Sequence, residues 1–548
     1  MGNTSRDTLS YSVVPPLTHS PGMAFPHIPQ DLKEGTRVVV QTKYGPLRGG
    51  RTTNGAAVFL EVPYALPPVR FTDPQPLPED YWYEEKDYVH ETRHCYQPDN
   101  DGQGEGVPAA DRKGFGEPSE NPLFLNIVSP SRFTTKSKFP VTVFIHGGFL
   151  QFGSPHELSS QAQYAAEERE QVFVNIGYRL SVLGFLASDE PRVDGNFGFK
   201  DQWLALRWIR ENITGFGGDS ENIRLTGLSA GAHSVHQILH HISRLPDGEM
   251  SPIHTAVLQS NAILTVPKTL GELRPQFEAL CRALHLDPKA PHILQTLRDS
   301  AKVPAEALMG IIEDGSLDVE YRTFRGCLDG EWMASDPNPM SWQKSGNLAR
   351  KLREKGVKSI AIGHLSEEWY LYSIAHPVNG PEDVLPNILR YYPRPVVEKL
   401  MPMYRSLPTS ASAEEARRLM GDILSDGQVH LPVRLFARDF QRARFSVFRY
   451  QIHWTPEQVR PNGLVTHGTD RCLWALRVPI MSLPQKRVAV AWLDAIDKEL
   501  SILEREGTQT RALNQALTLR EDQTIGWVED KDWDQLMEIV KVLPGEDM

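Results

Sequence analysis

The chain has 548 residues, 40% of them hydrophobic, which is enough apolar material for a large buried core. Its formal net charge of -11 disfavours nucleic acids and anionic membrane surfaces as partners. No apolar run approaches the roughly eighteen residues of a membrane span, and no export pattern opens the sequence. We therefore expect a cytoplasmic protein, in which residues 1–35 form an extended or disordered arm.

The four cysteines, Cys95, Cys281, Cys327 and Cys472, are widely spread along the chain. Their spacing matches no pattern of metal ligands, so no metal site is expected. In a cytosolic protein such cysteines are more often free thiols than disulfides. Free thiols are therefore predicted.

The first half of the chain changes pattern twice. Residues 36–64 alternate in short strands with glycine-rich turns, and they predict a small antiparallel sheet that leads into a larger one. Residues 98–121 are rich in Gly, Asp and Glu, which indicates a long surface loop. The apolar runs 140–148 and 171–180 predict buried strands, and the pattern of 197–213 is helical.

Strand-like runs recur at 255–260, 358–365 and 445–452, with helical segments such as 273–286 and 413–424 between them. Helices follow from about residue 484, and 527–543 is expected to be the last. Buried strands that alternate with helices predict an α/β fold, in which helices flank a large, mixed and mostly parallel central sheet. Residues 36–548 are expected to form one domain.

One stretch combines a strand, a serine and a helix. Residues 222–242 contain a β-branched strand, the turn Gly227-Leu228-Ser229-Ala230-Gly231 and an amphipathic helix. The two glycines allow a strained turn that exposes the Ser229 hydroxyl, and the helix amides point towards developing negative charge. A glycine-rich turn with an uninvolved serine is the alternative. In this context we predict that Ser229 is a nucleophile.

A serine nucleophile needs a base that removes its proton and an acid that orients the base. His467 follows the last predicted strand of the set and suits the base, although it could be an ordinary loop histidine. After the strand 358–365 the sequence offers Glu367 or Glu368 as the acid, or simply a helix N-terminus capped by Ser366. The order serine, acid, histidine is that of α/β-hydrolases.

A second glycine turn follows a strand at His146-Gly147-Gly148. Its amides could meet the amide of Ala230 and bind the negatively charged oxygen of a reaction intermediate. An ordinary turn is the alternative, but the pairing with the serine turn favours an oxyanion hole.

Together these segments resemble a known family. The motifs VPYALPPVRF, SENPLFLNI, FIHGGFLQFGS, GYRLSVLGFLAS, GNFGFKDQWLALRWIRENITGFGGDS, GLSAG, CLDGEWM, IGHLSEEW and VTHGTD are similar to those of the type B carboxylesterases. These are the cholinesterase-like branch of the α/β-hydrolases, and within it the chain resembles intracellular fungal members. The matching segments span residues 36–476.

The resemblance implies an α/β-hydrolase fold and a serine esterase that needs neither metal nor organic cofactor. The family's nucleophile, acid and base fall on Ser229, Glu368 and His467. Its oxyanion amides fall on Gly148, Phe149 and Ala230. A small-molecule ester is the implied substrate, and the oligomeric state is left open.

The departures from the family pattern are informative. Phe149 replaces a third glycine and should narrow the space beside the ester carbonyl, which disfavours bulky tertiary esters. Leu228 replaces a glutamate before the nucleophile, and we expect Leu228 and Leu150 to line the substrate pocket. Trp369 follows the acid where glycine is usual, so Glu367 stays an alternative to Glu368.

Two disulfides of the family are also missing. Cys95 matches one half of a bridge whose other half is Pro122, and the partner position of Cys281 holds no cysteine. The tryptophan that binds choline in cholinesterases is absent from the loop between Cys95 and Pro122. These departures favour a reducing compartment and disfavour a cholinesterase.

Three functions are therefore compared. Hydrolysis of a carboxylic ester through an acyl-enzyme on Ser229 is the first. The same residues could instead transfer an acyl group or close a lactone in the biosynthesis of a secondary metabolite, if water is excluded. A non-catalytic binding protein is the third, and it is disfavoured because all three triad positions hold competent residues.

Overall fold

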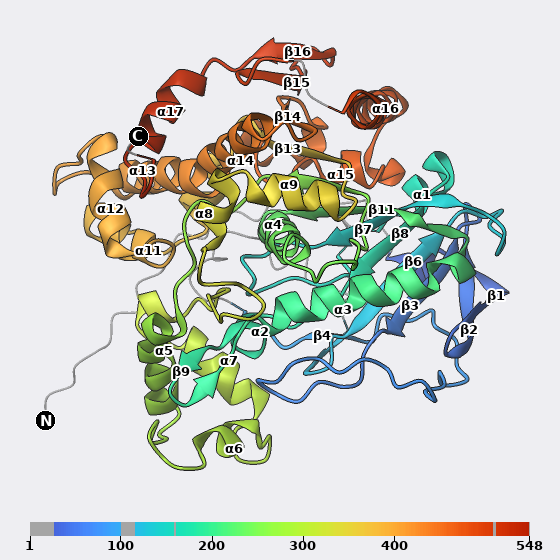
Figure 1. The fold of residues 1–548 in the computed structure, drawn as a ribbon, viewed down its shortest axis with the longest axis horizontal. Coiled ribbons are helices and arrows are strands. Elements are labelled where there is room, and N and C mark those ends of the chain that lie inside the picture. The colour runs from blue at the N-terminus through green and yellow to red at the C-terminus, as the bar shows by residue number, and fades with distance from the viewer. Residues whose placement is uncertain (1–26, 100–115, 158–160, 508–510, 547–548) are drawn as a thin grey trace, which may run out of the picture.

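A computed structural model describes residues 27–99, 116–157, 161–507 and 511–546. Within these ranges twelve strands form one continuous sheet, in the order β1-β2-β3-β6-β8-β7-β11-β12-β13-β14-β15-β16. Helices lie on both sides of this sheet (Figure 1). The predicted α/β fold, with a large and mostly parallel central sheet, is confirmed.

The longest strands of this sheet are β1 and β11, and the last two strands in its order, β15 and β16, are short. Their bounds are β1 Leu32–Thr42, β2 Gly45–Thr52, β3 Ala57–Pro63, β6 Phe124–Ser129, β7 Phe139–Ile145, β8 Val172–Ile176, β11 Gly218–Leu228, β12 Thr255–Gln259, β13 Ser359–Leu365, β14 Val447–Ile452, β15 Gln515–Leu519 and β16 Ile525–Glu529. Two small two-stranded sheets stand apart from it: β4 Arg93–Cys95 with β5 Glu117–Ser119, and β9 Ser188–Asp189 with β10 Arg192–Val193.

The helices range from a single turn to the long α16. Their bounds are α1 Gln163–Arg169, α2 Ser181–Phe185, α3 Phe197–Asn212, α4 Ala230–Ile242, α5 Leu270–Ala283, α6 Ile293–Arg298, α7 Ala305–Glu313, α8 Pro339–Lys344, α9 Asn347–Glu354, α10 Trp369–Ile374, α11 Val384–Leu389, α12 Arg394–Leu400, α13 Ala413–Ser425, α14 Leu431–Arg442, α15 Arg471–Trp474, α16 Leu483–Glu506 and α17 Trp533–Val540.

The pairing of the strands explains where a site can form. From β8 to β15 every neighbouring pair is parallel, whereas β1, β2, β3 and β6 pair antiparallel at one edge and β16 does so at the other. Because the carboxyl ends of parallel strands meet at one edge, the loops that leave β7, β11, β12, β13 and β14 converge there.

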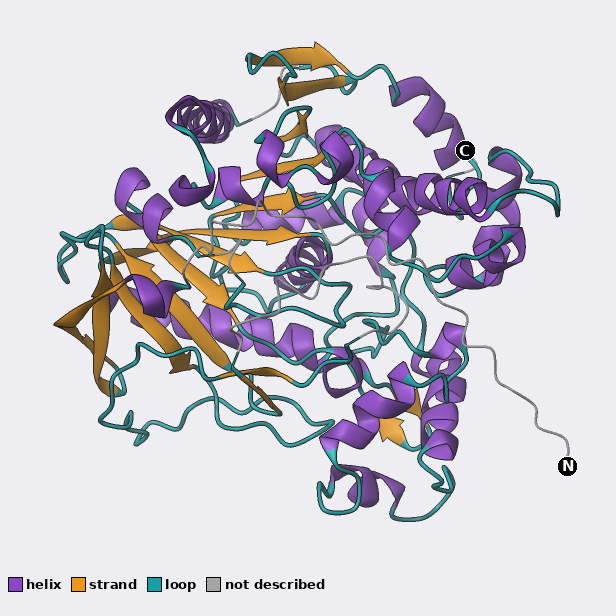
Figure 2. Cartoon of the chain, turned by 180° about the vertical axis from the view of Figure 1, so that it is seen from behind, coloured by secondary structure: helices purple, strands orange, loops and turns teal. Residues whose placement is uncertain are grey.

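Two apolar cores cover the two faces of the sheet. The larger core contains buried side chains of α3, α4, α5 and α14, and the smaller one contains those of α1, α15 and α16. The view from behind shows the sheet between these helix groups (Figure 2). Helix α4, which begins directly after Ser229, contacts β7, β11 and β12, so it is anchored at the centre of the sheet.

Several expectations are corrected in detail. Two strands, β15 and β16, lie between the C-terminal helices α16 and α17, and neither strand was predicted. The last helix, predicted for 527–543, begins only at Trp533, because residues 527–529 belong to β16. Both are five residues long and β16 is a partly exposed edge strand, so they lack a strong apolar pattern. Residues 1–26 of the predicted arm and 100–115 of the predicted loop lie outside the described residues. The strand β5 lies within the loop predicted for 98–121.

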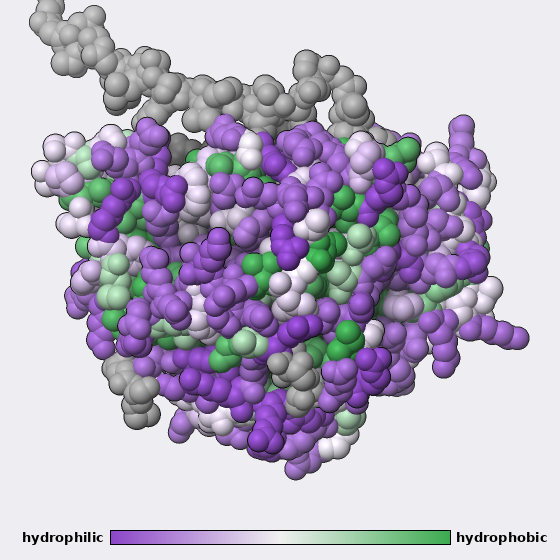
Figure 3. Space-filling model, turned by 90° about the horizontal axis from the view of Figure 1, so that it is seen from above, coloured by the Kyte–Doolittle hydropathy of each residue, from purple (hydrophilic) through white to green (hydrophobic). Residues whose placement is uncertain are grey.

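The surface agrees with the charged composition. On the face drawn in Figure 3, hydrophobic residues form small groups among hydrophilic ones. None of the helices in the described ranges is long and apolar enough to cross a membrane.

Candidate active site

The predicted nucleophile lies in a strained turn between β11 and α4. Ser229 has φ 57° and ψ −125°, a conformation that residues other than glycine rarely adopt. Its amide donates a hydrogen bond of 2.7 Å to the Gln259 carbonyl, and its own carbonyl accepts one from the His233 amide at 2.9 Å. These bonds hold the turn at the carboxyl edge of the sheet, as a nucleophile elbow requires.

The two glycines of the elbow are required by close approaches of the backbone. A Cβ atom on Gly227 would lie 2.3 Å from the carbonyl carbon of Gly231. A Cβ atom on Gly231 would lie 2.1 Å from the carbonyl oxygen of Ile145, at the end of β7. No side chain fits at either position, so strand, helix and β7 can pack this closely only with glycine.

The predicted oxyanion turn leaves β7 directly beside the elbow. A Cβ atom on Gly147 would lie only 3.0 Å from the Cβ of Ser229. Gly148, Phe149 and Leu150 follow with positive φ angles of 101°, 57° and 67°. Three such residues in succession turn the backbone sharply at this point. The turn thus lies in contact with the predicted nucleophile.

His146 holds the start of this turn in place. It is buried, its Nδ1 lies 2.9 Å from the Gly147 carbonyl oxygen, and its ring stacks on Tyr178 with centroids 4.6 Å apart. Burial lowers its pKa to about 4, so the imidazole is neutral at pH 7 and donates to that carbonyl. Ala230 is the first residue of α4, so its amide has no acceptor within the helix.

The predicted acid and base are in contact. Oε2 of Glu368, which follows β13, lies 2.6 Å from Nδ1 of His467, which follows β14. Oε1 of the same carboxylate accepts a hydrogen bond from the Leu365 amide at 2.9 Å. Burial alone would raise the pKa of Glu368, but its electrostatic interaction and hydrogen bond with His467, together with hydrogen bonds from Ser260 and the Leu365 amide, outweigh burial and lower this pKa. Glu368 is therefore ionised at neutral pH.

The other ring nitrogen of the base is left open. Nε2 of His467 is buried, and nothing in the described ranges forms a hydrogen bond with it. Such bonds between a base and a nucleophile often form only when substrate is bound. The loop of His467 also reaches the elbow, because a Cβ atom on Gly468 would contact the Leu228 side chain at 3.8 Å.

Glu367, the alternative acid, has a different partner. Its carboxylate accepts a hydrogen bond of 2.7 Å from the Val465 amide, and its own amide donates to the Val465 carbonyl at 3.1 Å. Glu367 thus holds the backbone of the loop two residues before His467. The geometry favours Glu368 as the acid.

Aromatic side chains lie next to the base His467 and connect it to the oxyanion turn. The ring of Tyr372, on α10, lies 5.9 Å from that of His467 and 6.3 Å from that of Phe149. Phe149 also lies 6.3 Å from the ring of His376. Sequence reasoning did not include Tyr372, although its position four residues after Glu368 on a helical pattern could have indicated it.

The two residues expected in the substrate pocket lie in different surroundings. Leu228 is half-buried beside the loop of the base. Leu150 is 2% exposed and packs in the larger core. Among the described residues, no three His, Cys, Asp or Glu side chains are grouped as metal ligands.

The chain is similar to known esterases over most of its length. Residues 36–488 match the profile of the family described as Carboxylesterase family. An uncharacterized esterase/lipase of Schizosaccharomyces pombe is 29% identical over 89% of this chain and 92% of its own. A carboxylic ester hydrolase of Gibberella moniliformis is 31% identical over 76% and 78%. A pyrethroid hydrolase of Mus musculus is 37% identical over 78% and 76%.

Proposed function

Because the chain belongs to the carboxylesterase family and is an enzyme that hydrolyses carboxylic esters, we propose that it does so through an acyl-enzyme on Ser229. The observation that carries this proposal is the 2.6 Å contact between Glu368 and His467, at the sheet edge where the strained Ser229 lies. The contact holds the imidazole with Nδ1 protonated, so Nε2 is free to accept a proton.

The proposed reaction proceeds in two steps. Nε2 of His467 takes the proton of Ser229 as its oxygen attacks the ester carbonyl. The carbonyl oxygen becomes negatively charged and is bound by the amides of Gly148, Phe149 and Ala230. His467 then gives the proton to the departing alcohol. A water molecule, activated in the same way, releases the acid and restores Ser229.

The side chains around the site limit the substrate. Phe149 follows Gly148 in the oxyanion turn, and its ring packs towards Tyr372 and His376. We therefore propose small-molecule esters without a bulky tertiary carbon next to the carbonyl. Leu228 places an apolar side chain beside Gly468, the residue after the base, so the proposed site does not attract a cationic alcohol at that position.

The thiols support a reducing location. Cys95, Cys281, Cys327 and Cys472 are all free and buried. Burial raises the pKa of Cys95 to about 12, so its thiol is unreactive at neutral pH. We propose that the protein works in the cytoplasm, where such thiols stay reduced.

The test is the initial rate of hydrolysis of p-nitrophenyl esters from acetate to decanoate, by the wild-type protein and by Ser229→Ala. We expect turnover by the wild type that falls at least about 1,000-fold in the variant. The acyl chain length that gives the highest rate would indicate the size of the acyl pocket. Equal rates for the two proteins would refute the proposed nucleophile.

A further inference from the structure

We propose that Arg471 is a positioning residue for this reaction, whose guanidinium holds the loop of the base against β12, which binds the Ser229 amide, and against β7, which leads into the oxyanion turn. The inference rests on the proposed function of Ser229 and His467. Arg471 stands four residues after His467, as the first residue of α15. Any shift of this side chain is therefore passed to the base through one short segment of backbone.

The guanidinium is connected to the nucleophile through one residue, Gln259. Nη1 of Arg471 donates to the side-chain oxygen of Gln259 at 3.2 Å. Gln259 ends β12, and its backbone carbonyl accepts the amide hydrogen of Ser229 at 2.7 Å. A single residue thus connects Arg471 to the strained amide of the elbow.

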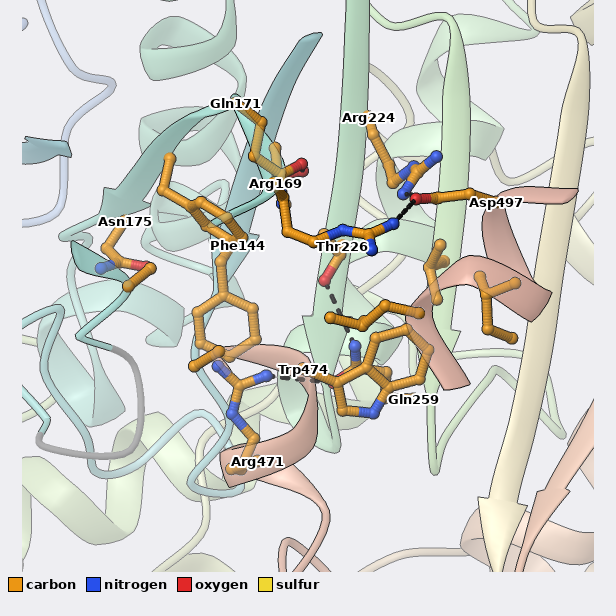
Figure 4. Close-up of a pocket in the computed structure, with 17 residues that line it drawn as sticks. Phe144, Arg169, Gln171, Asn175, Arg224, Thr226, Gln259, Arg471, Trp474 and Asp497 are labelled. Atoms are coloured by element: carbon orange, nitrogen blue, oxygen red, sulfur yellow. Dashed lines mark hydrogen bonds and ion pairs between the residues drawn. The ribbon is translucent and has the colours of Figure 1, made fainter. Parts of the chain in front are cut away.

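The same guanidinium also reaches the oxyanion turn. Its central carbon lies 3.7 Å from the ring centroid of Phe144, a cation–π contact. Phe144 is in β7, two residues before His146, where the oxyanion turn begins. In Figure 4 the guanidinium of Arg471 lies against the Phe144 ring and a dashed line joins it to Gln259. Arg471 therefore contacts β12 and β7, the two strands that flank β11, the strand of the nucleophile.

The surroundings of Arg471 are unusual for a purely structural side chain. It is 7% exposed, and burial lowers its pKa to about 10, so it still carries its charge at pH 7. Within the described residues, its Nε has no hydrogen-bond partner. Its hydrogen bond and its ring contact are with neutral groups, and the charges of Asp470 and Glu157 only partly offset the cost of burying it, so an apolar side chain would pack there at lower cost. Precise placement of the loop explains why a guanidinium stands there.

Two nearby arginines provide the contrast. Arg169 and Arg224 line the same cavity, of about 40 Å³, between the sheet and α16 (Figure 4). Each pairs with Asp497 on α16 at 2.7 Å. Among the described residues, no side-chain hydrogen bond or ion pair joins either arginine to the elbow, to β7 or to the loop of the base. Loss of Arg224 should therefore remove charge from this cavity without moving the base.

The cavity makes a chemical-rescue experiment possible. Arg471→Ala would enlarge it by the space of the lost side chain, whereas Arg471→Met would fill that space without charge or hydrogen bonds. In both variants we expect kcat on a p-nitrophenyl ester to fall roughly tenfold to a hundredfold at unchanged KM, because the base is misplaced rather than the substrate. Free guanidinium ion should restore kcat in Arg471→Ala but not in Arg471→Met, with sodium chloride at the same ionic strength as the control.

Arg224→Met is the matched control, and its kcat should stay within about twofold of the wild type. Circular dichroism and the melting temperature establish that each variant is folded. If Arg471→Ala does not fold, Gln259→Leu removes the acceptor of Arg471 and should lower kcat in the same way. A folded Arg471→Met or Gln259→Leu with wild-type kcat would overturn the proposal, and so would a loss in Arg471→Ala that guanidinium does not relieve. If the wild type shows no turnover that depends on Ser229, the proposed function fails and this inference falls with it.

Discussion

Glu368 and His467 are joined by a contact of 2.6 Å between Oε2 and Nδ1, while the adjacent Glu367 binds the backbone amide of Val465 at 2.7 Å. The two neighbouring acids therefore perform different tasks in one loop system. One orients the imidazole, and the other holds the segment that carries it.

This difference predicts unequal effects of the same substitution. Glu368→Gln removes the charge that stabilises the imidazolium, so kcat should fall about 1,000-fold or more. Glu367→Gln keeps a side-chain oxygen that can accept the Val465 amide, so the loss should stay below about tenfold. Steady-state kinetics of the two variants with a p-nitrophenyl ester test this. A larger loss for Glu367→Gln would reassign the acid.

The side chain of Phe149 is predicted to limit the substrate range. Its φ of 57° suits glycine, so Phe149→Gly should not strain the turn. Without the ring, kcat/KM for a tertiary ester relative to an acetate should rise about tenfold or more. Phe149→Leu, which keeps an apolar side chain, is the control. An unchanged ratio in Phe149→Gly would show that the ring does not face the ester.

Helix α4 predicts sensitivity to acid. Burial lowers the pKa of His233 and His240 to about 3 and that of His241 to about 4. A histidine in the unfolded chain has a pKa of about 6.5. Below this pH these histidines therefore bind protons in the unfolded state but stay neutral in the folded state. The free energy of unfolding should therefore decrease as the pH falls from about 6.5 towards these folded values. At pH 5 each such histidine should lower the free energy of unfolding by about 2 kcal/mol relative to its value at neutral pH.

His240 offers the cleanest variant for this effect. It is 2% exposed, and in the described part of the chain neither ring nitrogen has a hydrogen-bond partner. His240→Leu should lose less stability between pH 7 and pH 5 than the wild type, measured by urea unfolding at both values. Equal losses in the two proteins would show that His240 is not protonated on unfolding.

The cysteines predict a simple titration. Cys95, Cys281, Cys327 and Cys472 are free and buried, with pKa values raised by burial. A thiol reagent should therefore react slowly with the native protein and find four thiols after unfolding without reductant. Two thiols or none would mean that disulfides form, against a reducing location.

Local patterns made much of the site predictable from sequence. Gly227 and Gly231 flank Ser229 within five residues, and each is required by an approach of 2.3 Å or less. The strand before and the helix after them have clear periodicity, so the elbow could be placed without a structure.

Contacts between distant segments were not predictable. Arg471 and Gln259 are 212 residues apart, and no local pattern links them. Glu367 and Glu368 are adjacent and chemically equal, so only the path of the loop decides which of them contacts His467 and which contacts Val465. Strands β15 and β16 are short and partly polar, and they are recognisable only by their pairing at the edge of the sheet.

The central claim is that Ser229 is the nucleophile, and covalent trapping tests it most directly. The wild-type protein and Ser229→Ala would each be incubated with a fluorophosphonate and examined by intact mass and peptide mapping. We predict one adduct per wild-type chain, located on Ser229, and none on the variant. An adduct on another residue, or equal labelling of the variant, would contradict the claim.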